Sequence, residues 1–204
     1  MIVVHTARTT NGRKPLIALL ELEVEHQVRW IDLGSGIQRE PEFLAMNPYG
    51  KIPVLQDGEQ AIWESGAILL HLAERFGGLL PLDPAGRMLA IQLCFFQTGG
   101  LGPHGGRLAS QWGRAPEDRN AEAFDDGLQQ VQRILETMER ILGDGREHLA
   151  GPFSIADIMS YPWASYLQRL HIDGLEVPPG VAAWIARVGA RPAVKAAYSM
   201  RPAA

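Results

Sequence analysis

The chain has 204 residues, of which 46% are hydrophobic and 21% charged, and its formal net charge is −4 at pH 7. This length allows one large domain or two small ones, and the acidic balance, without a basic run longer than two residues, argues against nucleic-acid binding. The N-terminus lacks the apolar core of a signal peptide, and no apolar run approaches membrane-spanning length. We therefore expect a cytoplasmic protein with neither a nucleic-acid nor a membrane partner.

Up to residue 80, short β-type runs alternate with helical runs. Their patterns predict strands at 2–6, 26–33, 52–57 and 61–64, and helices at 13–23, 40–46 and 65–76. The first strand, helix and strand imply a parallel pair, because such crossovers are right-handed. The short "DGEQ" connection implies an antiparallel hairpin between the last two strands. The sequence therefore predicts an α/β region with a mixed four-stranded sheet.

A Gly/Pro-rich connector at 77–86 ends this pattern, and no convincing strand follows it. Apolar residues then recur at alternating spacings of four and three, as on a helix that packs against other helices. They are Phe124, Leu128, Val131, Leu135, Met138 and Leu142. A further helix begins at "FSIADIM", where Ser154 and Asp157 have the spacing of a capping box, and Pro162 is expected to bend it. The second part is predicted to be all-helical.

Two neighbouring motifs, "NPYGKIPVL" (47–55) and "ESGAILLHL" (64–72), indicate a binding site. A cis bond before Pro53 would turn the N–H and C=O groups of Ile52 outward, although an ordinary trans proline in a turn is the alternative. Ser65 is placed to cap a helix whose free amides attract an anion, and Glu64 adds the opposite charge. The pair suits the carboxylate and ammonium of an amino-acid head group. A plain capped helix with a solvated glutamate is the alternative.

The loop "ARTTNGRK" (7–14) joins the first strand to the first helix. Asn11 is expected to cap that helix, with Pro15 in its first turn and with Arg13 and Lys14 at its positive end. A thiol placed there would have its pKa lowered from about 8.5, and a threonine hydroxyl would donate to the thiolate. The loop contains no Cys, Ser or Tyr, so the ligand must bring the sulfur. A generic turn and cap is the alternative.

The remaining metal and redox signals are weak. Cys94 is the single cysteine, so neither an intramolecular disulfide nor a Cys-x-x-Cys pair is possible, and we expect a buried helical thiol. The six histidines lack metal-ligand spacing, so no metal site is expected. The run "GLGPHG" (100–105) fits a dinucleotide fingerprint, but it contains Pro103 and follows a helical run. Its glycines are expected to reduce the side-chain bulk of a helix where it faces the cleft between the domains.

The order of the elements, together with "NPYGKIPVL", "ESGAILLHLAE" and "FSIADI", resembles the cytosolic glutathione transferase family over essentially the whole chain. The segments "TTNGRK", "DLGSGIQREPEFLAMNP" and "FFQTGGLGP" are most similar to the nu class and its fungal prion-related relatives. The resemblance implies a thioredoxin-like glutathione-binding domain at 1–78 and an all-helical domain at 86–204. It also implies glutathione as cosubstrate and a homodimer.

The resemblance further implies roles for individual residues. Thr9 and Asn11 match the nu-class pattern for activating the thiolate, and Ile52 with the cis Pro53 matches the segment that pairs with the cysteinyl part of glutathione. The other binding positions are Glu64 and Ser65 for the γ-glutamyl end and Gln38 and Lys51 for the glycyl end. A solvated surface lysine remains the alternative for Lys51.

One position departs from the nu-class pattern. Alignment without gaps places Asp126 where those members carry an arginine that helps to bind glutathione. Either Arg119 or Arg133 compensates, or glutathione binds more weakly or in a different number per dimer.

The implied function is glutathione thiolate chemistry, either conjugation of small electrophiles, glutathione-dependent disulfide reduction, or both. A non-catalytic binding or interaction protein of the same fold is the alternative, and the intact Glu64-Ser65 pair argues against it. A redox protein that uses Cys94 is disfavoured by the solitary helical position of that residue.

Overall fold

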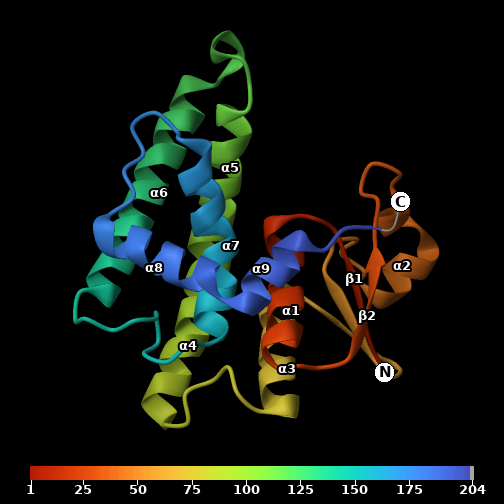
Figure 1. Ribbon diagram of the computed structural model, residues 1–204. Helices are drawn as coiled ribbons and strands as arrows, with labels where there is room; N and C mark the ends of the chain where they lie inside the picture. The colour runs from red at the N-terminus through yellow and green to blue at the C-terminus, as the bar shows by residue number, and fades with distance from the viewer. Residues whose placement is uncertain (203–204) are drawn as a thin grey trace. The chain divides into compact units, whose positions relative to one another are not determined.

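The computed structural model describes residues 1–202, in which sheet and helices precede a region of helices alone (Figure 1). Residues 1–79 and 190–202 form a first compact unit, and residues 80–189 form a second. The strands of the first unit are β1 (Ile2–Thr6), β2 (His26–Trp30), β3 (Val54–Asp57) and β4 (Gln60–Trp63). Its helices are α1 (Thr10–Glu21), η1 (Ile37–Arg39), α2 (Pro41–Met46), α3 (Ser65–Phe76) and α9 (Pro192–Ser199).

The four strands form one mixed sheet in the order β2-β1-β3-β4. β1 pairs in parallel with β2, with Val4 opposite Val28, and antiparallel with β3, with Val4 opposite Leu55. β3 and β4 form the antiparallel hairpin. In Figure 1, α1 and α3 lie on one side of this sheet and α2 lies on the other. The predicted α/β region with a mixed four-stranded sheet is confirmed.

Burial explains why β1 is central. All five of its residues are buried, as expected for a strand covered on both faces. β2, at the edge of the sheet, alternates between half-buried and exposed residues, so one of its faces meets solvent. The core of the unit contains fully buried apolar side chains from the sheet, α1 and α3, among them Val4, Leu16, Ile17, Val54, Leu55, Ile68, Leu69 and Leu72.

Helix α9 packs against α1 and thus belongs to the first compact unit, although its residues lie within the range 86–204 predicted for the helical domain. Arg191 binds the carboxylate of Glu21 with two nitrogens, at 2.6 and 2.7 Å. Arg13 donates to the carbonyl oxygen of Ala197. These contacts join residues more than 160 positions apart in the chain, which no local pattern in the sequence can predict.

Arg13 is buried beneath α9, where it donates to the backbone of that helix. Its guanidinium lies 5.9 Å from the ring of Trp30 and 5.4 Å from the ring of Tyr198. Burial, followed by the charge of Arg8, lowers the pKa of the Arg13 guanidinium. The residue therefore fixes the C-terminal segment on α1 through cation–π contacts and hydrogen bonds.

The second unit is helical, as predicted. It contains α4 (Pro84–Phe96), the π-helical turn η2 (Gln97–Leu101), α5 (Gly102–Trp112), η3 (Pro116–Asp118), α6 (Ala121–Leu142), α7 (Ile155–Leu170) and α8 (Pro179–Ala190). Cys94 is buried in α4. Among residues 1–202, no helix combines the length and the apolar character that crossing a bilayer requires.

The predicted apolar stripe of α6 faces the interior of this unit. Val131, Leu135, Met138 and Leu142 are buried, and the remaining two positions of the stripe are half-buried. This arrangement is the one expected when the spacing of apolar residues follows the 3.6-residue period of a helix.

The glycines of 100–106 lie in η2 and α5, so the segment is helical and is no dinucleotide-binding turn. A Cβ on Gly105 or Gly106 would stand 3.3 Å from the indole ring of Trp163 in α7. The glycines therefore allow α5 to approach α7 within the same unit. Their contacts with Trp163 differ from the predicted position beside the cleft between the domains.

Candidate functional site

Asn47 organises the loop that leads into β3. It is 2% exposed, its side-chain nitrogen donates to the carbonyl oxygen of Lys51 at 2.7 Å, and its Oδ1 accepts from the backbone N–H of Tyr49 at 3.0 Å. Gly50 has φ +64° and donates to the carbonyl oxygen of Asn47 at 2.9 Å, a conformation that glycine adopts without a steric penalty. The Asn-Pro and Gly-Lys pairs of the motif thus serve a single tight turn.

This turn delivers the Ile52-Pro53 segment to the start of β3, and its peptide bond is cis, as the resemblance implied. Pro53 is buried and Ile52 is half-buried. The next residue, Val54, pairs with Trp63 in the hairpin. The loop is therefore continuous with the sheet on one side and tied by Asn47 on the other.

Helix α3 begins differently from the expectation. Glu64, and not Ser65, is its N-cap, and the Glu64 side chain makes no capping hydrogen bond. Glu64 has φ 70° and ψ 118°, a backbone conformation rarely adopted by residues other than glycine. The first bond within the helix runs from Ile68 N–H to Glu64 C=O at 2.9 Å. The N–H groups of the first turn therefore point out of the helix end, where the helix dipole favours an anion.

Thr9, and not Asn11, caps α1. The Oγ1 atom of Thr9 accepts from the N–H of Gly12 at 3.0 Å, and Asn11 is an exposed residue of the first helical turn. The helix begins three residues earlier than predicted, so Pro15 lies inside it. Because the Thr9 oxygen already accepts, its own hydrogen points elsewhere and is able to donate to another group.

Gly12 makes this cap possible. A Cβ at this position would stand 2.2 Å from the carbonyl oxygen of Ala7 and 2.6 Å from Oγ1 of Thr6. The hydroxyl of Thr6 donates to the carbonyl oxygen of Gly12 at 2.8 Å. The first turn of α1 is thus folded back onto the end of β1, and only a residue without a side chain fits there.

Lys14 connects the starts of α1 and α3, a relation that no local pattern in the sequence indicates. It is 1% exposed, and its Nζ donates to Oγ of the buried Ser65 at 3.4 Å. A lysine five positions after a helix cap gives no local signal of its partner on another helix. A buried ammonium adjoining the first residue of α3 adds positive charge to that helix end.

The two residues expected near the glycyl end are placed differently from each other. Gln38 in η1 donates through Nε2 to the carbonyl oxygen of Leu33 at 3.2 Å, whereas its Oε1 atom is buried and has no hydrogen-bond partner. Lys51 is exposed, and its ammonium lies 4.0 Å from the ring centroid of Tyr49. Within the described residues, Gln38 thus has a buried acceptor that is not paired, and Lys51 is a cation held on an aromatic ring.

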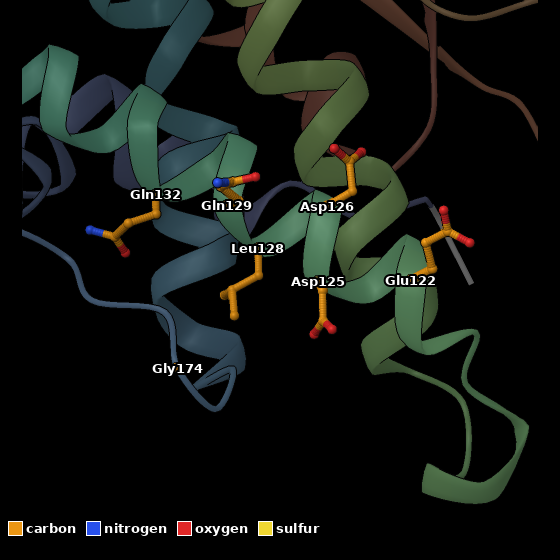
Figure 2. Close-up of a pocket in the computed structure, with 7 residues that line it drawn as sticks. All are labelled: Glu122, Asp125, Asp126, Leu128, Gln129, Gln132 and Gly174. Atoms are coloured by element: carbon orange, nitrogen blue, oxygen red, sulfur yellow. The ribbon is translucent and has the colours of Figure 1, made fainter.

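Asp126 lines an open groove of about 880 Å³ along α6 (Figure 2). Figure 2 shows Asp125 and Asp126 pointing to different sides of the helix, with Glu122 one turn earlier. The guanidinium of Arg119 is held elsewhere, 4.3 Å from the ring of Trp112 and donating to the carbonyl oxygen of that residue at 3.1 Å. Within the described residues, Arg119 therefore does not pair with Asp126.

A thioredoxin-like sheet unit with a cis-proline loop, accompanied by an all-helical unit, defines the glutathione transferase class of folds. Residues 10–75 match the family described as glutathione S-transferase, N-terminal domain, and residues 121–187 match glutathione S-transferase, C-terminal domain. The chain therefore belongs to the glutathione transferase family.

Relatives and solved structures agree with this assignment. The disulfide-bond oxidoreductase YfcG of Escherichia coli K12 is 36% identical over 95% of this chain and 92% of its own length. Glutathione S-transferase 1 of Schizosaccharomyces pombe is 32% identical over 96% and 93%. A crystal structure of a glutathione transferase family member from Pseudomonas fluorescens, with two glutathione bound, superposes with a TM-score of 0.88 at 32% identity, covering 98% of this chain and 93% of that one.

The family membership confirms the resemblance seen in the sequence and supports an enzyme over a non-catalytic protein of the same fold. The chain is a glutathione transferase-type enzyme, and its cosubstrate is glutathione. The similarity to a protein named disulfide-bond oxidoreductase agrees with the nu-class features of the loop 7–14.

Proposed function

We propose that glutathione lies along the loop 47–53 and the start of α3. Its γ-glutamyl carboxylate accepts from Ser65 and from the N–H groups of the first turn of α3, while Glu64 binds the ammonium group. The observation that carries this assignment is the helix end itself, which has no side-chain cap and begins with Glu64 at φ 70°. Backbone held in a sparsely populated conformation is concentrated at functional sites.

The rest of the tripeptide follows from that anchor. The backbone of Ile52, beside Pro53, pairs with the cysteinyl residue as an added strand would. At the glycyl end, the Oε1 atom of Gln38 would accept from the glycyl N–H, and the ammonium of Lys51 would donate to the glycyl carboxylate. These residues belong to the proposed glutathione-binding domain, 1–78. The proposed second domain, 86–204, is all-helical, and its last helix, α9, packs on α1 in the first compact unit.

Thr9 and Asn11 are proposed to activate the thiol. The hydroxyl of Thr9 is fixed by its bond from Gly12 and donates to the thiolate, and Asn11 lies in the same first turn of α1. The positive end of the helix dipole also favours the thiolate. Together they lower the thiol pKa from its ordinary value of about 8.5, so that more thiolate is present at neutral pH.

The reaction that this site serves best is disulfide exchange. The glutathione thiolate attacks one sulfur of a substrate disulfide, whose S–S bond breaks, so that a mixed disulfide forms and the other sulfur leaves as a thiolate that takes a proton from water. A second glutathione thiolate then attacks the glutathione sulfur of the mixed disulfide. Glutathione disulfide forms, and the substrate sulfur leaves as a thiolate. Supporting evidence is the name of YfcG and a solved neighbour from Pseudomonas putida described with one glutathione disulfide per subunit, at TM-score 0.89 and 30% identity over 99% of this chain and 92% of that one.

Conjugation of small electrophiles is the second candidate. The name of the S. pombe relative favours it. This reaction uses the same thiolate, but charge that develops on the electrophile must also be stabilised. The loop 7–14 has no tyrosine for that purpose, so we rank conjugation second.

The proposed assembly is a homodimer in the cytoplasm. Isologous pairing is the common solution for small two-domain enzymes, and several apolar side chains of the described residues are exposed, including Met88 and Phe95 on α4. Light scattering at micromolar concentration should give twice the 22.4 kDa mass of the chain. A mass near that of the monomer would contradict the dimer.

Two measurements test the function. Calorimetric titration with reduced and oxidised glutathione establishes binding, and initial rates compare 2-hydroxyethyl disulfide with 1-chloro-2,4-dinitrobenzene. We expect Thr9→Ala to reduce both rates by about 10- to 100-fold, Thr9→Ser to retain them, and the neighbouring Thr10→Ala to have little effect. Conjugation without any disulfide reduction in the wild type would rule out the exchange reaction.

A further inference from the structure

Lys14 is a cation enclosed by the first unit. Its side chain is among the largest fully buried ones, with 1% of its surface exposed, although it stands near the start of α1. The helices α1 and α3 pack against each other, and the ammonium crosses that contact to reach Ser65 at 3.4 Å. Lysine is rarely buried unless nearby groups stabilise its charge.

The contact has a defined direction. An ammonium group only donates hydrogen bonds, so the oxygen of Ser65 is the acceptor. The serine hydrogen is therefore directed away from Lys14. Lys14 thus fixes the side chain of Ser65 at the first position of α3, beside the N–H groups of the first helical turn.

The charge of Lys14 also reaches beyond Ser65. An anion hydrogen-bonded to Ser65 would stand about 4–6 Å from the lysine nitrogen, the range in which opposite charges stabilise each other strongly. Both Lys14 and Ser65 are buried, so solvent screens this attraction little. Lys14, Ser65 and the helix end would all act on one anionic group.

We propose that Lys14 is a further ligand-binding determinant, which recognises the α-carboxylate of the γ-glutamyl residue through Ser65. This inference rests on the proposed placement of glutathione and adds the charge that makes the site selective for a carboxylate. Ligands that carry an uncharged group at this point should lose the benefit of Lys14, while the remaining contacts of the tripeptide stay.

The test combines a change in the protein with a change in the ligand. Lys14→Met keeps the length and apolar stem of the side chain and removes the charge. The second ligand is 4-aminobutyryl-cysteinylglycine, which is glutathione without its α-carboxylate. We expect Lys14→Met to weaken glutathione binding by about 5- to 50-fold in calorimetry and to leave binding of the analogue unchanged.

The outcomes separate the inference from the proposed function. Lys195→Met, which removes an exposed charge from α9, is the control and should bind both ligands as the wild type does. If Lys14→Met weakened both ligands equally, the role of Lys14 would be structural and the inference would be overturned. A wild type that bound the analogue as well as glutathione would overturn it too. A wild type that bound neither ligand would overturn the proposed function itself.

A measurement on the wild type covers the case in which Lys14→Met does not fold. The chain has only three lysines, Lys14, Lys51 and Lys195, so ¹⁵N-labelled lysine gives a simple spectrum of ammonium groups. We expect the Lys14 signal to shift when glutathione binds and to stay in place with the analogue. A Lys14 signal that ignored both ligands, while calorimetry showed binding, would refute the inference.

Discussion

The helices α3 and α7 both begin beside a serine, but their first turns are satisfied in different ways. At α7, Ser154 is the N-cap, its Oγ accepts from Ala156 N–H at 3.3 Å, and Asp157 accepts from Ser154 N–H at 3.0 Å. At α3, Ser65 is the first helical residue, and the N-cap residue, Glu64, makes no side-chain capping hydrogen bond. A self-capped helix start, such as that of α7, contributes stability, and we call it the closed end. The start of α3, whose N-cap side chain makes no such bond, is able to bind a ligand, and we call it the open end.

The predicted capping box of α7 is confirmed, and the structure adds to it. The Oδ1 atom of Asp157 also accepts from Leu149 N–H at 3.0 Å and from the indole nitrogen of Trp184 at 2.8 Å. Asp157 therefore joins α7 to the preceding loop and to α8. Burial raises the pKa of this carboxyl group, while the hydrogen bonds oppose that shift.

The largest effect is expected at the closed end. Asp157→Ala leaves several buried donors without an acceptor and should lower the free energy of unfolding by about 3–5 kcal/mol. Urea denaturation followed by fluorescence measures this change. Asp125→Ala, on the exposed side of α6, is the control and should stay within about 0.5 kcal/mol of the wild type. Equal stability of the two variants would contradict the structural role of Asp157.

The two serines provide the most direct comparison. Ser65→Ala should weaken glutathione binding by about 1–3 kcal/mol, because a donor to a charged group is lost. Ser154→Ala should leave that affinity unchanged and lower the free energy of unfolding by about 1–2 kcal/mol, the usual value of a helix cap. Calorimetric titration measures the glutathione affinity of both variants, and urea denaturation measures their free energies of unfolding. If Ser65→Ala bound glutathione like the wild type, the assignment of the open end would be wrong.

A smaller effect is expected from the charge on α6. Asp126→Arg introduces the residue type that the nu-class resemblance leads us to expect, and it should tighten binding of oxidised glutathione about 2- to 5-fold. Asp125→Arg makes the same change in charge on a side chain that points to the other side of the helix (Figure 2). Only Asp126→Arg should alter the affinity. Equal affinities of both variants and the wild type would remove any role for Asp126.

The smallest effect concerns the loop that precedes the closed end. Arg146 forms two hydrogen bonds with Asp144 at 2.9 and 3.0 Å through Nε and donates to the carbonyl oxygen of Leu149 at 3.2 Å. The hydrogen bonds from Arg146 to Asp144 lower the pKa of Asp144 from 3.8 to about 2. The carboxylate thus stabilises the fold above pH 3.8, and this contribution is lost as the pH falls through about 2.

Asp144 is fully exposed, so the difference in unfolding free energy between wild type and Asp144→Asn should be small and should decrease with added salt. Chemical denaturation at several pH values measures that difference, which should vanish at the acid end of the series. If this difference grew as the pH fell, the predicted direction of the pH dependence would be wrong.

Most of the elements were predictable because their signals are local. The β-type run at 2–6, the helical period of α6 and the Ser154-Asp157 spacing each act over a few residues, so the sequence predicted the sheet, the helical second part and the closed helix end. The family motifs likewise predicted a binding site at the loop 47–55 and the start of α3. What these local patterns predicted incorrectly were the residues at the two helix starts of the site.

Both errors have the same physical cause. Thr9 and Asn11 are each able to cap a helix, and so is Ser65, so residue type alone does not choose among them. The choice at α1 depends on the close approach of Gly12 to Ala7 and Thr6, and the choice at α3 depends on a conformation of Glu64 that propensity disfavours. Tertiary packing supplies the contacts that hold these conformations.

The sequence by itself determined the order of the elements, the apolar faces and the family, because these depend on period, turn chemistry and short motifs. Only the tertiary structure joined Lys14 to Ser65 and placed α9 on α1 through Arg13 and Glu21. Those pairs lie 51 or more positions apart in the chain. Their energies arise from burial and charge at contacts that exist only after the helices have packed, so no pattern within a segment encodes them.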